Sequence, residues 1–485
     1  MTIRTEVPSL PRQPVATRVP LPRVRPAVAA LIAANLATVT FFLLSYSPHG
    51  ISVGPYRVDL DVYRIGSAVW RHGGDLYGLL PRTSSGAQLP FSYPPFAAMV
   101  MSPLTLLPMK AAGVLCTLVT IALTALVLGI FLRSVGVTGR HAVAWLLPAA
   151  LLLEPVRNTL NYGQVNVALM ALVTADCLVS SPRWPRGALT GIAAAVKLTP
   201  AAFVLFFLLR RDRRAALTAA VSFAACTGAG FLLAGRDSTE YWTSVLFQSG
   251  RPGSPAYAAN QSILGVIARA GLDPHSPAGT ALWLTLSAAV VVAACRGMRR
   301  ALAASEPAWA LSLNAFAALL ICPISWSHHW VWGETAVLIL AVGSRHWGRL
   351  KLAAVAVGVL LFAVAPQWWF PDGGNRELHW AAWEQVVGDS YVIYAAVILI
   401  GAALWGTVSN FPDSPASATY PEIASPAWQA RWPTGLGRAG SPGFAVPAAG
   451  GSCCRWLSWS PPLRARSPGW CSSRAGRVRT RAAGR

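Results

Sequence analysis

Apolar runs of membrane-spanning length recur along most of this chain, and they restrict its fold more than any other feature. A helix needs about 20 largely apolar residues to cross the hydrocarbon core of a bilayer, and the run from about Pro26 to Leu44 is of that kind. Of the 485 residues, 54% are hydrophobic and only 12% are charged, so such runs dominate the chain. Helices satisfy their own backbone hydrogen bonds in lipid. We therefore expect an all-α, polytopic integral membrane protein.

The apolar pattern predicts about twelve crossings. The candidate spans lie near residues 27–46, 111–132, 142–154, 163–180, 187–197, 199–210, 215–234, 278–295, 308–322, 335–343, 352–369 and 390–408. Several of them are shorter than a full crossing. Short or broken helices are tolerated at membrane depth where they line a protein cavity, so some of these spans are expected to be half-helices.

Basic clusters set the expected orientation. The net charge of +22 comes from Lys and Arg between the apolar runs and in the two tails, and no nucleic-acid-binding module accompanies it, so we expect no nucleic-acid partner. Basic loops stay cytoplasmic, which places 210–214, 296–300 and 345–351 inside. The loops left outside are 47–110, 155–162, the junction near 198, 235–277, 323–334 and 370–389. They hold nearly every unusual polar group in the chain.

Composition also predicts the domain boundaries. Residues 1–26 are a basic segment expected in the cytoplasm, and the following apolar run is too long for the signal peptide that is the alternative. Residues 27–409 form the membrane domain. Residues 410–485 are rich in Pro, Gly, Ser and Arg, which predicts a disordered, basic cytoplasmic tail. The 8 cysteines show no C-x-x-C spacing, so no metal site and no cofactor is expected.

The first outer loop contains the stretch "YRVDLDVYRIG", with Asp59, Asp61, Tyr63 and Arg64 close together. Two carboxylates so near each other repel and gain no packing, which indicates a use for them. A solvated loop or an N-cap for a short helix around 62–71 is the simpler interpretation. A D-x-D pair that ligates a divalent cation is another alternative.

A second polar cluster is "EPVRNTLNYGQVN". On a helix that starts at Glu154, the residues Arg157, Asn161 and Gln164 follow at spacings of three and four and share one face, with Asn166 close by. Polar groups at membrane depth usually face a cavity or one another. We interpret this face as a polar wall for a hydroxyl-rich ligand, with helix–helix hydrogen bonds as the alternative.

Three further motifs lie in the predicted outer segments. Lys197 in "AAAVKLTP" either extends to lipid headgroups or is a cation suited to a phosphate. Asn260 and Gln261 in "ANQSILGVIAR" lie at a loop-to-helix junction, where capping is the alternative to ligand binding. His328 and His329 in "PISWSHHWVWGE" are costly to desolvate unless they bind or transfer something.

Six blocks of the chain, in this order, resemble glycosyltransferase family 87: "DLDVYRIG", "YPPFAAMVMSPLTLLP", "EPVRNTLNYGQVNVALMALV", "GIAAAVKLTP", "NQSILGVIAR" and "ISWSHHWVW". The resemblance covers about residues 27–408. The family comprises actinobacterial membrane mannosyltransferases of the GT-C type that use polyprenyl-phosphate-mannose. It implies about twelve transmembrane helices, with outer-side loops that form an active site open to the periplasmic side of the cell membrane.

The resemblance also implies roles for the residues. It places the catalytic base, which deprotonates an acceptor hydroxyl while the sugar transfers with inversion, on Asp59, with Asp61 as the residue that tunes or orients it. The catalytic histidine maps to His328 or His329. We assign binding of the donor phosphate to Lys197, Arg64 and Tyr63. We assign substrate binding to Glu154, Arg157, Asn161, Gln164, Asn166, Asn260 and Gln261. A monophosphate leaving group needs a base and cations but no divalent metal.

The expected partners are a polyprenyl-phosphate sugar donor, a glycolipid or glycan acceptor and membrane lipids. An arabinofuranosyltransferase that uses decaprenyl-phosphate-arabinose is the main alternative. A lipid or sugar transporter is a weaker alternative, because no internal repeat with matched broken helices is found. The acceptor, the linkage and the oligomeric state are left open by the sequence.

Overall fold

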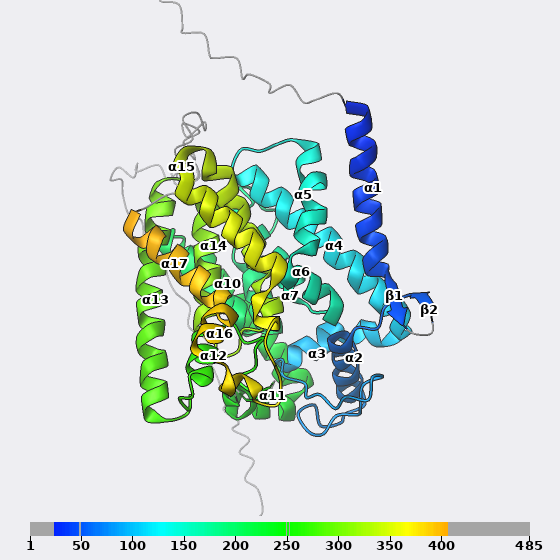
Figure 1. The fold of residues 1–485 in the computed structure, drawn as a ribbon. Coiled ribbons are helices and arrows are strands. Elements are labelled where there is room, and N and C mark those ends of the chain that lie inside the picture. The colour runs from blue at the N-terminus through cyan, green and yellow to red at the C-terminus, as the bar shows by residue number, and fades with distance from the viewer. Residues whose placement is uncertain (1–23, 48–49, 249, 252, 406–485) are drawn as a thin grey trace, which may run out of the picture. The chain divides into compact units, whose positions relative to one another are not determined.

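The computed structural model describes residues 24–47, 50–248, 250–251 and 253–405 (Figure 1). All of them belong to one compact unit, Met1–Ala418. The predicted tail at 410–485, and nearly all of the basic segment at 1–26, lie outside the described residues.

Helices make up most of the described part. The first nine α-helices are α1 (Val24–Leu43), α2 (Val58–Arg71), α3 (Pro95–Met101), α4 (Met109–Ser134), α5 (Arg140–Leu152), α6 (Glu154–Tyr162), α7 (Asn166–Leu178), α8 (Ala188–Val196) and α9 (Val204–Leu209). The other eight are α10 (Arg213–Leu233), α11 (Gly235–Thr243), α12 (Ile263–Arg269), α13 (Pro277–Ala303), α14 (Pro307–Ile321), α15 (Trp332–Val364), α16 (Ala382–Gly388) and α17 (Ser390–Trp405). Short 3₁₀ helices are η1 (Ser102–Leu106), η2 (Thr199–Phe203), η3 (Val245–Phe247), η4 (Ser327–Val331), η5 (Pro366–Trp368) and η6 (Arg376–His379).

A small antiparallel ladder departs from the expected all-α fold. Strands β1 (Leu44–Ser47) and β2 (Gly50–Val53) follow α1 directly, and Leu44 pairs with Val53. The two strands contain Tyr, Ile and Val, which favour extended backbone. Because the apolar run continues from the helix into β1, hydropathy alone extended the first span to residue 46, three residues past the end of α1.

The number of full-length crossings is smaller than the predicted twelve. Within the described residues, five helical segments are long and apolar enough to cross a membrane: Pro26–Leu43, Met109–Ser134, Arg213–Leu233, Pro277–Ala303 and Arg349–Trp368. A sixth is counted if α16 and α17, which are bent by 66°, form one span. Most of the other predicted spans correspond to shorter apolar helices, such as the 13-residue α5 and α7. The chain is therefore a multi-pass membrane protein, but twelve crossings are not confirmed.

The residue range of α15 covers two antiparallel arms. A Cβ added at Gly333 would lie 2.5 Å from the Phe362 ring, and one added at Gly358 would lie 2.8 Å from Val337. In a straight helix these partners would be tens of ångströms apart at 1.5 Å per residue. The chain therefore reverses between Val337 and Gly358, as expected for the two separate spans predicted at 335–343 and 352–369.

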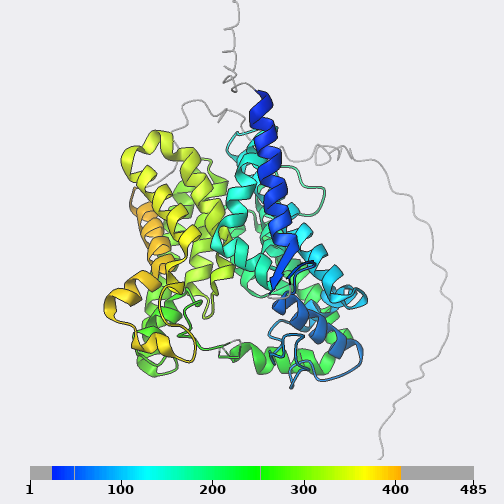
Figure 2. The same ribbon diagram turned by 45° about the vertical axis from the view of Figure 1, so that its right-hand side comes forward.

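Several short helices, three of which carry sequence motifs, gather at one end of the described part. Figures 1 and 2 show α2, α3, α11, α12 and α16 at the end opposite the start of α1, which is the lower end in both views. Longer helices, including α4 and α13, run from this end toward the other (Figure 1). Residues that are far apart in sequence are thus brought close enough to share a cavity.

Candidate active site

A cavity of about 1150 Å³ opens among the motif-bearing segments. Of the residues predicted for the site, those that line it are Asp59, Tyr63, Gln164, Lys197, His328 and His329. They come from α2, from the loop after α6, from the break after α8 and from η4. The cavity therefore joins four of the sequence blocks in one place.

Asp59 lies in the first turn of α2 and is held by an amide. Gln164 Nε2 donates a hydrogen bond to Asp59 Oδ2. The orientation of this amide is fixed, because Gln164 Oε1 accepts hydrogen bonds from Tyr63 Oη at 2.7 Å and from Tyr93 Oη at 3.2 Å. Asp59 Oδ1 has no hydrogen-bond partner among the described residues. One oxygen of the carboxylate is therefore oriented by the protein, and the other is available to a ligand.

Gly163 brings Gln164 to Asp59. It ends α6 in the left-handed conformation, with φ of 73°, and a Cβ there would lie 2.7 Å from Arg57 Cβ and 2.8 Å from Leu60 Cβ. Only glycine allows this backbone conformation and this close approach of α2 together. The prediction that Gln164 continues one face of the helix from Glu154 is therefore wrong, because the helix stops at Tyr162.

Burial raises the pKa of Asp59 to about 6, against the opposing effects of the Gln164 hydrogen bond and the Lys197 charge. A carboxyl group with a pKa near neutrality is ionised at pH 7 and yet basic enough to accept a proton. The environment of Asp59 thus suits a general base.

Lys197 lies where the chain breaks between α8 and η2, with extended backbone angles of −148° and 127°. Its Nζ is 3.0 Å from Asn166 Oδ1 and 3.0 Å from His329 Nε2, and it lies 5.3 Å from the centre of the Tyr93 ring. The ammonium group therefore points into the protein and lines the cavity, not toward lipid headgroups.

Both histidines of the "SHHW" block line the cavity. Burial and the Lys197 charge lower the pKa of His329 well below its usual value, so its neutral ring accepts from Lys197 through Nε2. His328 is 7% exposed, its Nε2 has no partner among the described residues, and its ring lies 5.3 Å from that of Tyr162. The His328 carbonyl accepts from Asn166 Nδ2 at 2.9 Å, which ties η4 to α7.

Asp61 and Arg64 lie outside the cavity lining. Residues two apart on a helix point about 200° away from each other, so Asp61 faces away from Asp59. Asp61 Oδ2 accepts from Ser84 N at 2.7 Å and Ser84 Oγ at 2.8 Å, which holds the loop around residue 84. Arg64 donates to the carbonyls of Leu104 and Leu107 at 3.0 and 2.6 Å. The alternative of a metal-binding D-x-D pair does not fit carboxylates on opposite faces.

The predicted polar wall of α6 is not part of the lining either. Glu154 is 1% exposed and accepts from Asn158 Nδ2 at 2.6 Å, Trp368 Nε1 at 2.9 Å and Tyr391 Oη at 3.0 Å. Asn161 is exposed and Arg157 is half-buried. Glu154 matches the alternative of hydrogen bonds between helices, and it also holds a cavity residue, Trp368.

Asn260 and Gln261 are fully buried in the wall behind the cavity. Asn260 Oδ1 accepts from the backbone N–H of Ser325 at 2.9 Å, and Gln261 Nε2 donates to the carbonyl of Gly388 at 2.8 Å. Arg269 reinforces the same region, since it pairs with Asp389 and donates to the Asn260 carbonyl. The two amides shape the wall by binding backbone groups.

The sequence interpretation missed several lining residues. They are Tyr93, Tyr162, Arg251, Tyr257, Trp326 and Trp368. Tyr93 and Trp326 lie inside the sequence blocks quoted above. The aromatic residues of those blocks could therefore have been predicted to line the cavity. Arg251, which donates to the Phe91 carbonyl at 3.3 Å and to the Tyr77 carbonyl, had no such signal.

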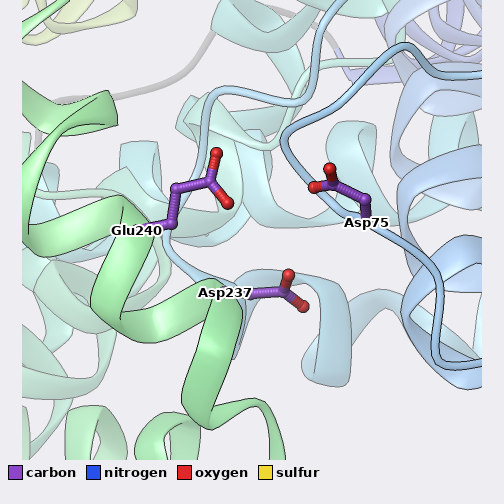
Figure 3. Close-up of side chains that lie close together, drawn as sticks. All are labelled: Asp75, Asp237 and Glu240. Carbon is purple, nitrogen blue, oxygen red and sulfur yellow. The ribbon is translucent and has the colours of Figure 1, made fainter. Parts of the chain in front are cut away.

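An acidic cluster lies apart from the cavity lining. Figure 3 shows Asp75 from the loop after α2 beside Asp237 and Glu240 of α11, and their ligand atoms lie within 4.8 Å of one another. Asp75 Oδ1 accepts from the backbone N–H groups of Tyr77 and Gly78 at 3.1 and 3.0 Å, and Arg236 lies 3.6 Å from its other oxygen. These contacts tie the loop to α11, and we assign no metal to the cluster.

Comparison with known proteins identifies the family. The profile of glycosyltransferase family 87 matches residues 91–323. A Mycobacterium tuberculosis protein named polyprenol-phosphate-mannose-dependent alpha-(1-2)-phosphatidylinositol mannoside mannosyltransferase is 42% identical over 353 residues, which cover 69% of this chain and 81% of that protein. This chain belongs to glycosyltransferase family 87. The sequence-based recognition is confirmed, and the chain is a membrane glycosyltransferase.

Two further matches were found. A Mycolicibacterium smegmatis protein of the same name is 38% identical over 348 residues. These residues cover 67% of this chain and 78% of that protein. The crystal structure of ArnT from Cupriavidus metallidurans bound to undecaprenyl phosphate matches with a TM-score of 0.38 and 14% identity, over 79% of this chain and 78% of that one.

Proposed function

We propose that this enzyme transfers mannose from polyprenyl-phosphate-mannose to a phosphatidylinositol mannoside in an α-(1→2) linkage, with inversion, and that Asp59 is the general base. The observation that carries the proposal is that Asp59 and the Lys197–His329 pair line one cavity in a chain whose relatives are named for this donor and this acceptor class. All of the named relatives use mannose, which disfavours the arabinofuranose alternative.

In the proposed reaction Asp59 Oδ1 takes the proton of an acceptor hydroxyl as its oxygen bonds to the anomeric carbon of mannose. The bond between that carbon and the phosphate oxygen breaks, and polyprenyl phosphate leaves with the electron pair. Lys197 is the cation for the growing charge on the phosphate, and a neutral His329 donates to it through Nδ1–H. Such pre-oriented donors stabilise a transition state most where water is excluded.

Many of the side chains that line the cavity suit the lipid chain of the donor. Those without polar atoms come from α9, η3, α13 and α14 and include Leu205, Val245, Leu246, Val291, Ala317 and Ile321. An isoprenoid chain that enters from the bilayer meets such a surface without leaving apolar surroundings, whereas a nucleotide would have to bury polar groups there without partners. The aliphatic lining therefore supports a polyprenyl donor over a nucleotide sugar.

The finer topology belongs to the same proposal. We propose a GT-C architecture of about twelve crossings, some of them short, with the cavity on the outer face of the cell membrane. The cytoplasmic assignment of residues 1–26 and 410–485, on either side of a membrane domain at 27–409, also remains a prediction. It rests on the alternation of basic segments with the segments that line the cavity.

Purified full-length protein in lipid nanodiscs tests the function. We expect labelled mannose to pass from polyprenyl-phosphate-mannose to a phosphatidylinositol mannoside. Decaprenyl-phosphate-arabinose and GDP-mannose should support no transfer. Transfer of arabinose, or transfer of mannose only from GDP-mannose, would contradict the proposal.

A further inference from the structure

Three aromatic side chains form one wall of the cavity. Tyr257, Trp326 and Trp368, here called the aromatic wall, all line it and are half-buried. The ring of Tyr257 lies 5.8 Å from that of Trp326 and 6.0 Å from that of Trp368, in edge-to-face arrangements. They come from three different segments of the chain, so the fold assembles the wall from residues distant in sequence.

The aromatic wall carries polar groups that the protein does not use. Among the described residues, neither the Tyr257 hydroxyl nor the Trp326 indole N–H has a hydrogen-bond partner. Half-buried Tyr and Trp side chains usually find one. The only indole N–H of the wall that is used is that of Trp368, which donates to Glu154. The wall thus offers ring faces together with free donors, whereas lining residues such as Leu205 and Val245 offer aliphatic side chains alone.

The backbone around the wall holds the rings in place. Residue Asn260 forms a β-bridge with Trp326, and a Cβ at Gly253 would lie 3.3 Å from the Trp326 ring. Glu154, buried behind the wall, fixes the Trp368 indole. Side chains held in this way lose little conformational entropy when a ligand binds.

The wall continues toward the proposed reaction centre. Tyr162 lines the same cavity, and its ring contacts that of His328. Asp59 lines the same cavity, and its negative charge adds to the effect of burial, which raises the pKa of Tyr162. Next to Tyr257, whose backbone N–H donates to the Ser254 carbonyl at 3.1 Å, Asn375 Oδ1 accepts from Ser254 Oγ at 3.0 Å, and Ser254 and Asn375 both line the cavity. A bound molecule can therefore extend from Asp59 along the wall to a polar rim.

We propose that the aromatic wall is the binding subsite for the mannose residues of the acceptor that do not react, an assignment that rests on the function proposed above. A sugar ring has apolar C–H faces and hydroxyl edges, and rings with polar tips complement both. The donor has a single sugar, which must lie at Asp59, and an aliphatic chain. Only the acceptor has further sugars to occupy this wall.

Steady-state kinetics of full-length variants tests the subsite. Trp326→Leu removes a ring face and an unpartnered N–H, so it should raise the KM for a phosphatidylinositol mannoside about tenfold. Tyr257→Phe removes one hydroxyl and should raise it about threefold. The KM for polyprenyl-phosphate-mannose should stay within about twofold in both variants, because the wall does not contact the donor.

Trp369→Leu is the matched control. Trp369 is the neighbour of Trp368, is 61% exposed and does not line the cavity, so the KM for the acceptor should not change. A rise confined to the donor KM, or an unchanged acceptor KM in both wall variants, would overturn the proposal. Tyr257→Phe keeps the ring, so it tests the wall even if Trp326→Leu fails to fold.

Native mass spectrometry of acceptor binding separates this proposal from the proposed function, because it needs no turnover. We expect the wild-type chain to bind a phosphatidylinositol mannoside more tightly than Trp326→Leu or Tyr257→Phe does. Equal binding by all three would refute the subsite whether or not mannose is transferred. Wild-type chain that binds the acceptor but transfers no mannose would refute only the proposed function.

Discussion

Asp59 and Asp61 show how residue spacing separates two chemically identical groups. Both lie in the first turn of α2, but the helix turns them to opposite faces. Asp59 meets Gln164 and the cavity, whereas Asp61 meets Ser84. The sequence could predict that something uses this pair. The family resemblance pointed to Asp59, but the spacing alone could not predict which residue faces the cavity, because that depends on whether the loop is helical or extended there.

The pH dependence of the reaction should follow the ionisation of the Asp59 carboxyl group. A base must be deprotonated to act, so kcat/KM should fall as the pH drops through about 6, the pKa to which burial raises Asp59. The Gln164 hydrogen bond lowers this pKa, so Gln164→Leu should move the acidic limb to higher pH. A pH–rate profile of the two proteins checks the direction. An acidic limb that does not move, or moves to lower pH, would contradict the assignment.

Lys197→Met should weaken the use of the donor. The substitution keeps a long side chain and removes the charge proposed to face the phosphate, so the KM for polyprenyl-phosphate-mannose should rise by about tenfold or more. Lys110→Met is the matched control, since Lys110 is exposed at the start of α4 and does not line the cavity. Equal donor KM values in the two variants would show that Lys197 has no role with the phosphate.

At the scale of elements, the end of α6 decides the geometry of the site. The polar pattern from Glu154 to Gln164 predicted one continuous helical face, but Gly163 ends the helix and turns Gln164 toward α2. Glycine after the last residue of a helix is a common stop signal, so this break was readable from the sequence. The contact between Gly163 and α2 was not readable, because it involves residues about 100 positions away.

Gly163→Ala should destabilise the folded chain more than Gly136→Ala. Both glycines have φ near 75°, at 73° and 80°, so both substitutions strain the backbone by about 1–3 kcal/mol. Only at Gly163 does the added Cβ also clash with Arg57 and Leu60, since nothing lies within 4 Å at Gly136. Thermal unfolding in detergent measures the difference. Equal shifts in Tm would show that α2 moves to accommodate the added methyl group with no further loss of stability.

At the scale of the whole molecule, hydropathy predicted where helices occur better than how long they are. The long helices α4, α10 and α13 match their predicted spans within several residues, apart from the C-terminal end of α13. The spans predicted at 187–197 and 199–210 are only the 9-residue α8 and the pair η2–α9. Apolar content marks burial in lipid or in protein alike, so it cannot distinguish a short buried helix from a crossing.

The proposed orientation predicts which loops an impermeant reagent can reach from outside the cell. Cysteine at Leu79, which is 86% exposed after α2, should react with an impermeant maleimide in intact cells. Cysteine at Thr138, exposed between α4 and α5, should react only after the membrane is opened, because α4 is long enough to separate the two sites. The unsubstituted chain gives the background from native cysteines. Labelling of Thr138→Cys in intact cells would overturn the proposed orientation.

The most direct test of the account compares Asp59→Asn with Asp61→Asn in the mannose-transfer assay. A general base contributes about 10²- to 10⁴-fold, so Asp59→Asn should lower kcat at least about a hundredfold in protein that unfolds at the wild-type temperature. Asp61→Asn leaves the proton acceptor in place and should lower kcat far less, although loss of its charged hydrogen bonds to Ser84 should lower Tm. Near-normal turnover by Asp59→Asn would show that Asp59 is not the general base.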